Sequence, residues 1–357
     1  MSFFGLKNNW FGFLGSQLGI DLGTSNTPIF LRGKGILFSE PSYVAVNQNT
    51  GKVIAVGEKA KQMHGRTPPH ITVIRPLRDG VIANFEIAYE MLKFLMNKAL
   101  PNRYFSSTSV ILGVPSDCTP VERRAVEEAA HHAGGRNVVL AAQPFLAAIG
   151  AGLPVREAVG SMIVDIGGGT TEIAILSLGG IASSQSLRVA GDKMDEAIVS
   201  YLKKAYNLII GERTAEAIKI QLGSVSSEIE LKTMEVRGRD VFSGLPRSQV
   251  VTSQDVKESL IEPISRIVEG VKSTLEHSPP ELVSDIMEHG IVTAGGGALI
   301  SGFSHKIREA TGISCHLAND PINCVALGAG RLFEDLPFLK EVAARGTAYW
   351  EHPVEVA

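Results

Sequence analysis

The sequence predicts an α/β fold built from two similar lobes. Strand-like runs alternate with helical runs along most of the chain, which is typical of α/β proteins. The segment LGIDLGTSNTPIFL at residues 18–31 also has a counterpart in MIVDIGGGTTEIAIL at residues 162–176. Finally, the chain has 357 residues, of which 44% are hydrophobic. That is enough apolar material to bury more than one core.

The alternation of elements is clearest in the first half of the chain. Buried strands are expected over 109–115 and 137–143, and helices over 85–100, 120–135 and 144–153. Pro120 near the start and glycines at the end frame the second of these helices. Residues 182–250 are more polar and predict helices and hairpins. Residues 265–290 predict a helix that is broken at Pro279 and Pro280.

Composition excludes several classes of protein. The 34 basic and 37 acidic side chains leave a net charge of -3, which gives no electrostatic footprint for nucleic acid. Cys118, Cys315 and Cys324 are odd in number and form no CxxC pair, so a reducing compartment fits better than a disulfide scaffold or a zinc site. No apolar run approaches the ~20 residues of a membrane span. The first residues lack the basic leader of a secretory signal.

The two similar segments match at positions that carry chemistry. An aspartate, a glycine and a threonine recur at the same spacing: Asp21 and Asp165, Gly23 and Gly167, Thr27 and Thr171. Each segment predicts a strand, a tight glycine turn and a second strand. Such a repeat indicates an internal duplication, with one copy at the head of each half.

The composition of these turns favours phosphate binding. Small residues let consecutive backbone N–H groups approach an anion closely, and Thr24, Ser25, Thr170 and Thr171 add hydroxyl donors. An aspartate would repel a bare phosphate, but it suits a Mg²⁺ ion held between carboxylate and phosphates, largely through water. Two such hairpins facing each other would clamp the phosphates of a nucleotide between two lobes. The alternative is two unrelated hairpins whose Asp and Gly only make turns, and the repetition argues against it.

A third glycine cluster lies between a predicted strand and a predicted helix. In TAGGGALISGF, Gly295, Gly296 and Gly297 would let a flat adenine and its ribose lie against the backbone. A glycine-rich turn from strand to helix is common, so this cluster has little weight by itself.

The three motifs, in this order, resemble the phosphate-1 loop, phosphate-2 loop and adenosine motif of actin-type ATPases. The closer resemblance is to the MreB family of bacterial actin-like filament proteins. It is carried by segments that include IDLGTSNT, VPSDCTPVERRAVEEAA, GDKMDEAI and the glycine motifs above, and it spans residues 18 to 332. It implies an actin-like ATPase fold, with two duplicated ribonuclease H-like lobes around a nucleotide cleft.

The resemblance also implies a division into subdomains. Subdomain IA would comprise 18–32, 75–150 and 316–340, IB 33–74, IIA 151–181 and 250–315, and IIB 182–249. An N-terminal amphipathic segment, 1–17, and a C-terminal tail, 341–357, would flank these subdomains.

The roles of the site residues follow from the same resemblance. Asp21 and Asp165 would act in catalysis and face the metal ion, with Mg²⁺ and ATP or GTP as cofactors. Phosphate contacts would come from the two turns, at Gly23, Thr24, Ser25 and Asn26, and at Gly167, Gly168, Gly169 and Thr170. Gly295, Gly296 and Gly297 would line the adenosine, and Glu216 and Lys219 would lie near the adenine and ribose.

One departure from the family bears on the reaction. MreB proteins usually carry two adjacent acids before the proline that opens the helix at 144–153, and here Ala142 and Gln143 replace them. The second acid orients the attacking water. Glutamine can hydrogen-bond water but cannot take its proton. Because actins also carry glutamine here and hydrolyse ATP, we expect Gln143 to be catalytic in a slow ATPase. The alternative is a polar residue that only ends a strand.

The first sixteen residues carry a large apolar surface. At 100° per residue, one half of a helical wheel collects Phe3, Phe4, Leu6, Trp10, Phe11, Phe13 and Leu14. We expect this segment to lie in a membrane interface as an amphipathic helix, in keeping with the membrane association of MreB filaments. The alternative is a strap packed on the protein's own surface.

These observations predict a nucleotide-dependent, filament-forming cytoskeletal protein. By resemblance, its partners would be copies of itself in paired protofilaments, the inner face of the cell membrane, and the cell-wall elongation and membrane-anchored morphogenesis proteins. It would be cytoplasmic, peripheral on the membrane, and would maintain rod shape. Chaperone-type ATPases share the fold but need a substrate-binding domain after it. Sugar and acetate kinases need an acceptor pocket and a catalytic base, and the sequence has no motif for either.

Overall fold

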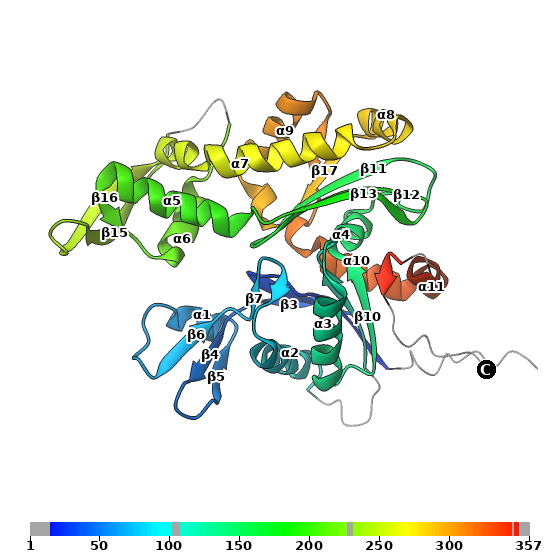
Figure 1. Cartoon of the computed structure of the whole chain (residues 1–357), viewed down its shortest axis with the longest axis horizontal. Coiled ribbons are helices and arrows are strands. Elements are labelled where there is room, and N and C mark those ends of the chain that lie inside the picture. Colours follow the sequence, from blue (N-terminus) through cyan, green and yellow to red (C-terminus); the bar gives the residue numbers. More distant parts are fainter. Residues whose placement is uncertain (1–14, 102–107, 227–230, 345, 350–357) are drawn as a thin grey trace, which may run out of the picture. The chain divides into compact units, whose positions relative to one another are not determined.

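The computed structural model describes residues 15–101, 108–226, 231–344 and 346–349. Contacts divide the chain into unit 1, Met1–Gly150 with Val325–Ala357, and unit 2, Ala151–Cys324 (Figure 1). The second crossing between units therefore falls after residue 324, whereas the sequence predicts it after 315. Strand β18 (Cys315–Leu317) contributes to this difference, because it pairs with β17 (Ile291–Ala294) in the sheet of unit 2.

Unit 1 is organised around a six-stranded sheet of order β19-β10-β9-β1-β2-β3. The strands are β1 (Ser16–Asp21), β2 (Asn26–Leu31), β3 (Gly35–Pro41), β9 (Thr108–Val114), β10 (Asn137–Ala142) and β19 (Ala348–Tyr349). Strands β1 and β10 both run parallel to β9, and the last residue of β1, Asp21, lies opposite Gly113. Because parallel strands share a direction, the carboxyl ends of these three strands meet at one edge of the sheet.

Five helices accompany the six-stranded sheet in the described part of unit 1. They are α2 (Phe85–Ala99), α3 (Pro120–His132), α4 (Gln143–Ala151), α10 (Cys324–Glu334) and α11 (Leu336–Ala344). Helices α2 and α3 pack side by side, and apolar residues of both share a core with the strands. Local signals set their starts. The Asn84 side chain accepts from the Ile87 N–H, and Thr119 with Glu122 forms a capping box.

A small three-stranded sheet is inserted between β3 and α2. It contains β5 (Val53–Val56), β4 (Val44–Asn47) and β6 (Ile71–Ile74), with helix α1 (Glu58–Met63) packed against it. Tyr43, Ala45 and Ala60 form its own small core. The two-residue strands β7 (Leu77–Arg78) and β8 (Val81–Ile82) then lead back to α2.

Unit 2 is organised around a five-stranded sheet of order β13-β12-β11-β17-β18. Its further strands are β11 (Ser161–Ile166), β12 (Thr171–Ser177) and β13 (Gly180–Leu187), and its helices are α5 (Gly191–Tyr206), α6 (Glu212–Leu222), α7 (Ser253–Glu276), α8 (Pro280–His289) and α9 (Phe303–Thr311). Helices α5 and α7 pack together over a continuous apolar core. As the sequence predicts, a break before Pro280 separates α7 from α8.

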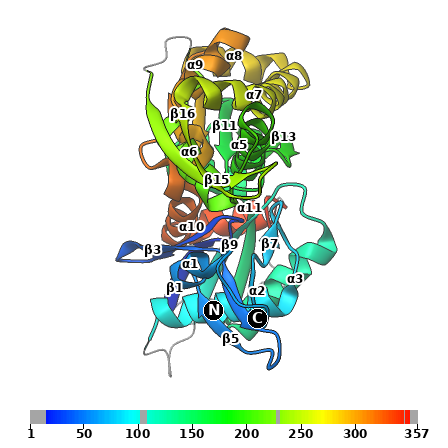
Figure 2. The ribbon, with the colours of Figure 1, turned by 90° about the vertical axis from the view of Figure 1, so that its left-hand side faces the viewer.

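A second, three-stranded sheet in unit 2 joins β14 (Leu208–Ile209) to the hairpin of β15 (Thr233–Asp240) and β16 (Pro246–Thr252). Figure 2 shows this hairpin as a long twisted ribbon beside α6. Val236 and Val251 anchor it to the core of unit 2. The prediction of helices and hairpins in this polar stretch is confirmed.

The ends of the chain are only partly described. Residues 1–14, which hold nearly all of the predicted amphipathic segment, lie outside the described residues, and Ser16 already opens β1. The C-terminal tail, to which the sequence assigns no role, contributes Val342, a buried residue of α11, and the strand β19, which pairs with β10. Within the described ranges, no helix combines the length and apolarity needed to cross a bilayer.

Candidate functional site

The first hairpin places Asp21 at the end of β1 and turns back into β2. Other residues of unit 1 donate hydrogen bonds to the backbone carbonyls of this turn. The Ser42 hydroxyl donates to the Gly23 carbonyl at 2.6 Å, and the Ser42 N–H donates to the Ser25 carbonyl at 2.9 Å. Arg75 donates to the Thr24 carbonyl at 3.2 Å. No acceptor in the described part of the chain takes the N–H of Gly23, Thr24 or Ser25. The turn therefore presents donors, which suits an anion.

Further contacts support this first turn. The Gly80 N–H donates to Oγ1 of Thr24 at 3.1 Å, and the Arg75 guanidinium lies 5.6 Å from the centre of the Tyr43 ring. A Cβ atom on Gly23 would lie 2.4 Å from the Asn26 carbonyl oxygen, so the turn requires a glycine. No pattern in the sequence indicates the supporting role of Ser42, Arg75 and Gly80, because only the folded chain brings them to the turn. Asn26 is exposed and opens β2.

Asp21 and Gln143 meet beside this turn. The Gln143 Nε2 donates to Asp21 Oδ1 at 3.0 Å. Gln143 opens α4 directly after β10 and is 8% exposed. Burial raises the pKa of the Asp21 carboxyl to about 7, and the hydrogen bond from Gln143 opposes that rise. Such a carboxylate is costly to ionise alone and gains from a nearby cation.

The second hairpin repeats the arrangement in unit 2. The Gly167 N–H donates to the Thr170 carbonyl at 2.9 Å, while the Gly167 and Gly168 carbonyls accept from the N–H groups of Gly191 at 3.1 Å and Asp192 at 2.8 Å. No acceptor among the residues that the structure describes takes the N–H of Gly168, Gly169 or Thr170. As in the first turn, carbonyls of the turn accept hydrogen bonds from the protein, and these backbone N–H groups could donate to a ligand.

The third glycine cluster lies against this second turn. Gly295 has a φ of +80°, and a Cβ there would lie 2.2 Å from the Ile166 carbonyl oxygen and 2.5 Å from Asp165 Oδ1. Asp165 is buried at the end of β11 and lies opposite Ala294 of β17. At Gly296, a Cβ would meet nothing within 4 Å. The backbone is therefore close-packed toward Asp165 at Gly295 and open at Gly296, as a flat ligand would need.

Lys219 reaches the second turn indirectly. Its Nζ donates to the Gly191 carbonyl at 2.8 Å and to Asp195 Oδ2 at 2.9 Å. Burial raises the pKa of the Asp195 carboxyl to about 6, against the lowering effect of Lys219. Glu216, on the same helix as Lys219, adds a repelling charge. Asp195 lies within the GDKMDEAI segment, but no sequence pattern predicts a role for it.

The candidate residues thus form one cluster in each unit. Unit 1 brings together Asp21, Gln143 and the turn at 23–25. Unit 2 brings together Asp165, the turn at 167–170, the glycines 295–297 and, through α5, Lys219.

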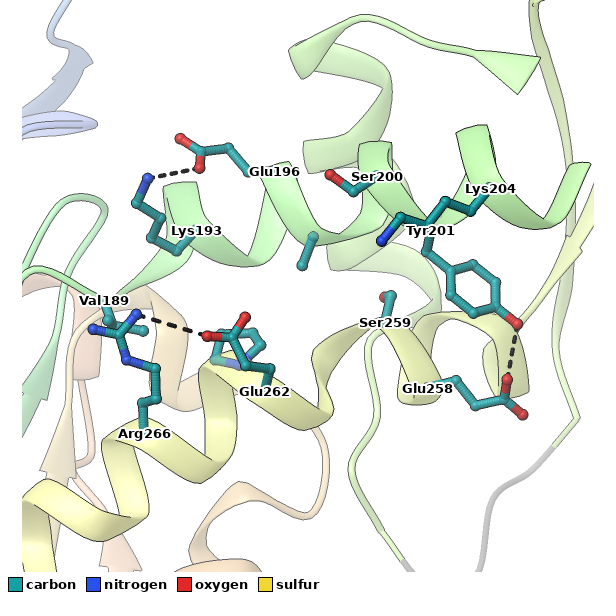
Figure 3. Close-up of a pocket in the computed structure, with 12 residues that line it drawn as sticks. Val189, Lys193, Glu196, Ser200, Tyr201, Lys204, Glu258, Ser259, Glu262 and Arg266 are labelled. Carbon is teal, nitrogen blue, oxygen red and sulfur yellow. Dashed lines mark hydrogen bonds and ion pairs between the residues drawn. The ribbon is translucent and has the colours of Figure 1, made fainter. Parts of the chain in front are cut away.

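Unit 2 also has a groove between α5 and α7, with a volume of about 430 Å³ (Figure 3). Three cationic and three anionic side chains line it: Lys193, Lys204, Arg266, Glu196, Glu258 and Glu262. Two ion pairs lie along the helices: Lys193 with Glu196 at 2.6 Å and Arg266 with Glu262 at 3.7 Å. Because the charges balance, the groove does not select an anion.

The fold and the duplicated turns define an actin-like protein. The crystal structure of MreB5 of Spiroplasma citri bound to ADP superposes on this chain with a TM-score of 0.87 at 36% identity, covering 92% of this chain and 99% of that one. The MamK double helical filament gives a TM-score of 0.78 at 25% identity, covering 90% and 99%. The family model described as MreB/Mbl protein matches residues 15–341, and the chain belongs to this family.

Curated relatives agree with this assignment. The chain is 48% identical over 328 residues to the cell shape-determining protein MreB of Escherichia coli K12, covering 90% of this chain and 94% of that protein. It is 47% identical over 329 residues to the cell shape-determining protein Mbl of Bacillus cereus, covering 92% and 99%. The resemblance identified from the three sequence motifs is confirmed.

Proposed function

We propose that this chain binds ATP and assembles into filaments of the MreB type. The observation that carries the proposal is the pair of turns whose carbonyls are held by the protein while their N–H groups have no acceptor among the described residues. Both turns would contact the phosphates of one nucleotide, and Gly295–Gly297 would receive the adenosine. The structures of Spiroplasma citri MreB5 bound to ADP and to AMPPNP support a nucleotide ligand.

A Mg²⁺ ion fits the residues present. The burial that raises the pKa of Asp21 makes its charged form costly, and a divalent cation would offset that cost. Asp21 and Asp165 would face the ion. No group of three or more His, Cys, Asp or Glu that could hold a metal occurs in the described ranges, so phosphate oxygens and water would supply most ligands. When bound, the ion would neutralise charge on the phosphates.

Hydrolysis would depend on Gln143. Its Nε2 is used by Asp21, which fixes the amide and leaves Oε1 to accept a hydrogen bond from the attacking water. An amide orients water but does not accept its proton, so turnover would be slow. Slow hydrolysis suits a protein in which the bound nucleotide sets the stability of an assembly.

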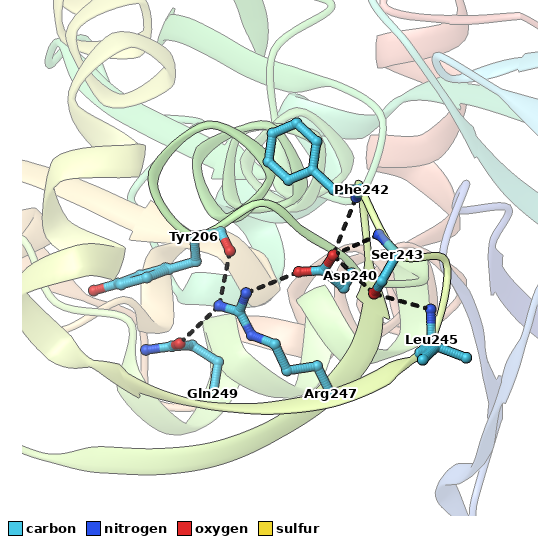
Figure 4. Close-up of polar contacts among 7 residues, drawn as sticks. All are labelled: Tyr206, Asp240, Phe242, Ser243, Leu245, Arg247 and Gln249. Atoms are coloured by element: carbon cyan, nitrogen blue, oxygen red, sulfur yellow. Dashed lines mark hydrogen bonds and ion pairs between the residues drawn. The ribbon is translucent and has the colours of Figure 1, made fainter.

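Self-association would use the tip of the β15–β16 hairpin, shown in Figure 4. Phe242 is 81% exposed and Leu245 66% exposed. The tip is held firmly, because Asp240 Oδ1 accepts the N–H groups of Phe242 at 3.1 Å and Ser243 at 2.9 Å. A preformed apolar tip loses little entropy on docking. We assign a second copy of this chain as its partner, which the double helical filament of MamK supports.

Residues 1–16 would anchor the filament to the inner face of the membrane, where it would organise cell-wall elongation through membrane-anchored morphogenesis proteins. Co-sedimentation with anionic liposomes tests the anchor. The full chain should pellet with lipid, and a chain lacking residues 1–14, which keeps β1 whole, should stay in solution. Equal pelleting of both forms would refute the anchor.

The core of the proposal is tested by high-speed pelleting. The protein should pellet with Mg-ATP and remain in solution without nucleotide. Pelleting that is the same with and without nucleotide, together with no detectable ATP binding, would refute the proposal. ADP release that depends on an added sugar would instead favour a small-molecule kinase.

A further inference from the structure

The first turn of α5 is a junction between two parts of the candidate site. The N–H groups of Gly191 and Asp192 donate to the carbonyls of Gly167 and Gly168, so the second phosphate turn is attached to this helix. A Cβ on Gly191 would lie 3.2 Å from Lys219 Nζ and 3.3 Å from the Gly167 carbonyl oxygen. Little room is left for the junction to shift.

Lys219 joins the same junction from helix α6. Two of the three N–H groups of its ammonium donate hydrogen bonds within the protein, to the Gly191 carbonyl and to Asp195 Oδ2. Both partners of the ion pair are largely buried, with side-chain exposures of 14% for Lys219 and 13% for Asp195. A pair this shielded is screened little by salt.

Asp195 is left incompletely satisfied. Its Oδ1 is buried and has no hydrogen-bond partner in the described structure. Glu216 from α6 and Asp192 from α5 both repel its charge, and only Lys219 attracts it. A purely structural ion pair gains most when every oxygen is bonded, and this one is not. A buried carboxylate with a raised pKa and one unbonded oxygen, next to a candidate site, indicates a role in that site.

We propose that Asp195 is a positioning residue for nucleotide binding: it holds the Lys219 ammonium on the Gly191 carbonyl and so links the helix beside the nucleoside to the turn beside the phosphates. The inference rests on the proposed function. It predicts that Asp195 acts through Lys219, without touching the ligand itself.

A double-mutant cycle on the full chain tests this link, with a fluorescent ATP analogue and Mg²⁺ as the probe. Asp195→Asn should weaken binding about tenfold, because the Lys219 ammonium would lose the carboxylate that holds it on the Gly191 carbonyl. Lys219→Gln should weaken binding at least as much, and the double variant should lose no more than Lys219→Gln alone. Glu196→Gln is the matched control on the same helix, since its partner Lys193 is exposed (Figure 3). It should bind as the unmodified chain does.

The pH profile adds a readout that a structural role would not change. Protonation of Asp195 releases Lys219, so affinity should fall as the pH is lowered through about 6. Asp195→Asn should remove that part of the fall. The groups facing Asp195 are Lys219 and Glu216 from α6 and Asp192 from α5.

Unchanged affinity in Asp195→Asn, or losses that add in the double variant, would overturn the inference. If Asp195→Asn does not fold, Lys219→Gln and the pH profile of the unmodified chain decide it: full affinity in the former, or a profile that is flat near pH 6, overturns it. Absence of nucleotide binding by the unmodified chain would instead count against the proposed function.

Discussion

Gln143 and Asp21 are 122 residues apart in the chain, yet Gln143 Nε2 donates to Asp21 Oδ1 at 3.0 Å. The contact exists because β1 and β10 flank β9 and all three run parallel, so that the end of β1 and the start of α4 meet. A residue that the sequence singles out for its departure from the family therefore lies against the carboxylate that we assign to the metal.

Changing Gln143→Glu should raise the rate of ATP hydrolysis roughly tenfold or more, because a carboxylate can take the proton of the attacking water. Phosphate release in single-turnover experiments measures it. Gln143→Ala serves as the control and should hydrolyse more slowly than the unmodified chain. A Glu variant no faster than the unmodified protein would show that Gln143 does not act on the water.

Asp21→Asn should stabilise the nucleotide-free protein at pH 8 by on the order of 2 kcal/mol, because it removes a buried charge. Burial raises the pKa of the Asp21 carboxyl from 3.8 to about 7. The protonated carboxyl therefore carries no penalty below about pH 3.8, and the folded protein loses stability as the pH rises through 7 and the buried group ionises. Urea unfolding at pH 5 and pH 8 measures the difference. The same variant should lose stabilisation by Mg-ATP. A variant that Mg-ATP still stabilises fully would contradict the metal role.

Gly295→Ala should destabilise the protein by roughly 1–3 kcal/mol and abolish nucleotide binding, because φ is +80° there and the new methyl group would meet Asp165 Oδ1. Thermal unfolding and ATP titration check the two effects. Gly296→Ala is matched in chemistry but meets nothing within 4 Å, so it should keep the melting temperature. Equal melting temperatures for both variants would refute the argument from geometry.

Phe242→Asp should reduce the amount of protein pelleted with Mg-ATP severalfold while leaving ATP binding intact, because a charge at the tip opposes burial against another copy. Phe242→Leu keeps the tip apolar and should pellet nearly as well as the unmodified chain. Should Phe242→Asp pellet normally, the tip is not an assembly surface.

Local patterns were sufficient for most of the secondary structure. The helix predicted over 120–135 occupies Pro120–His132, and both duplicated segments form hairpins. The strand β19 was not predicted, since two residues carry no periodicity and its stability comes from pairing with β10 far earlier in the chain. The late boundary between units has the same origin, because β18 is assigned by its pairing with β17.

Within the candidate site, the repeated aspartates and glycines were visible in the sequence, and Asp195 was not. An acid on an amphipathic helix is normally solvated, and nothing in GDKMDEAI distinguishes Asp195 from the exposed Glu196 next to it. Only the packing of α5 against α6 separates them.

By itself, the sequence determined the class of fold, the family and the two turns, because those depend on residue types at short spacing: small residues where the backbone must be accessible, and an acid at the end of a strand. The tertiary structure decided which polar groups hold the carbonyls of those turns, that Gln143 meets Asp21, and that Asp195 holds Lys219. These contacts join residues distant in the chain, and their geometry depends on sheet order and helix packing, which short-range patterns do not encode.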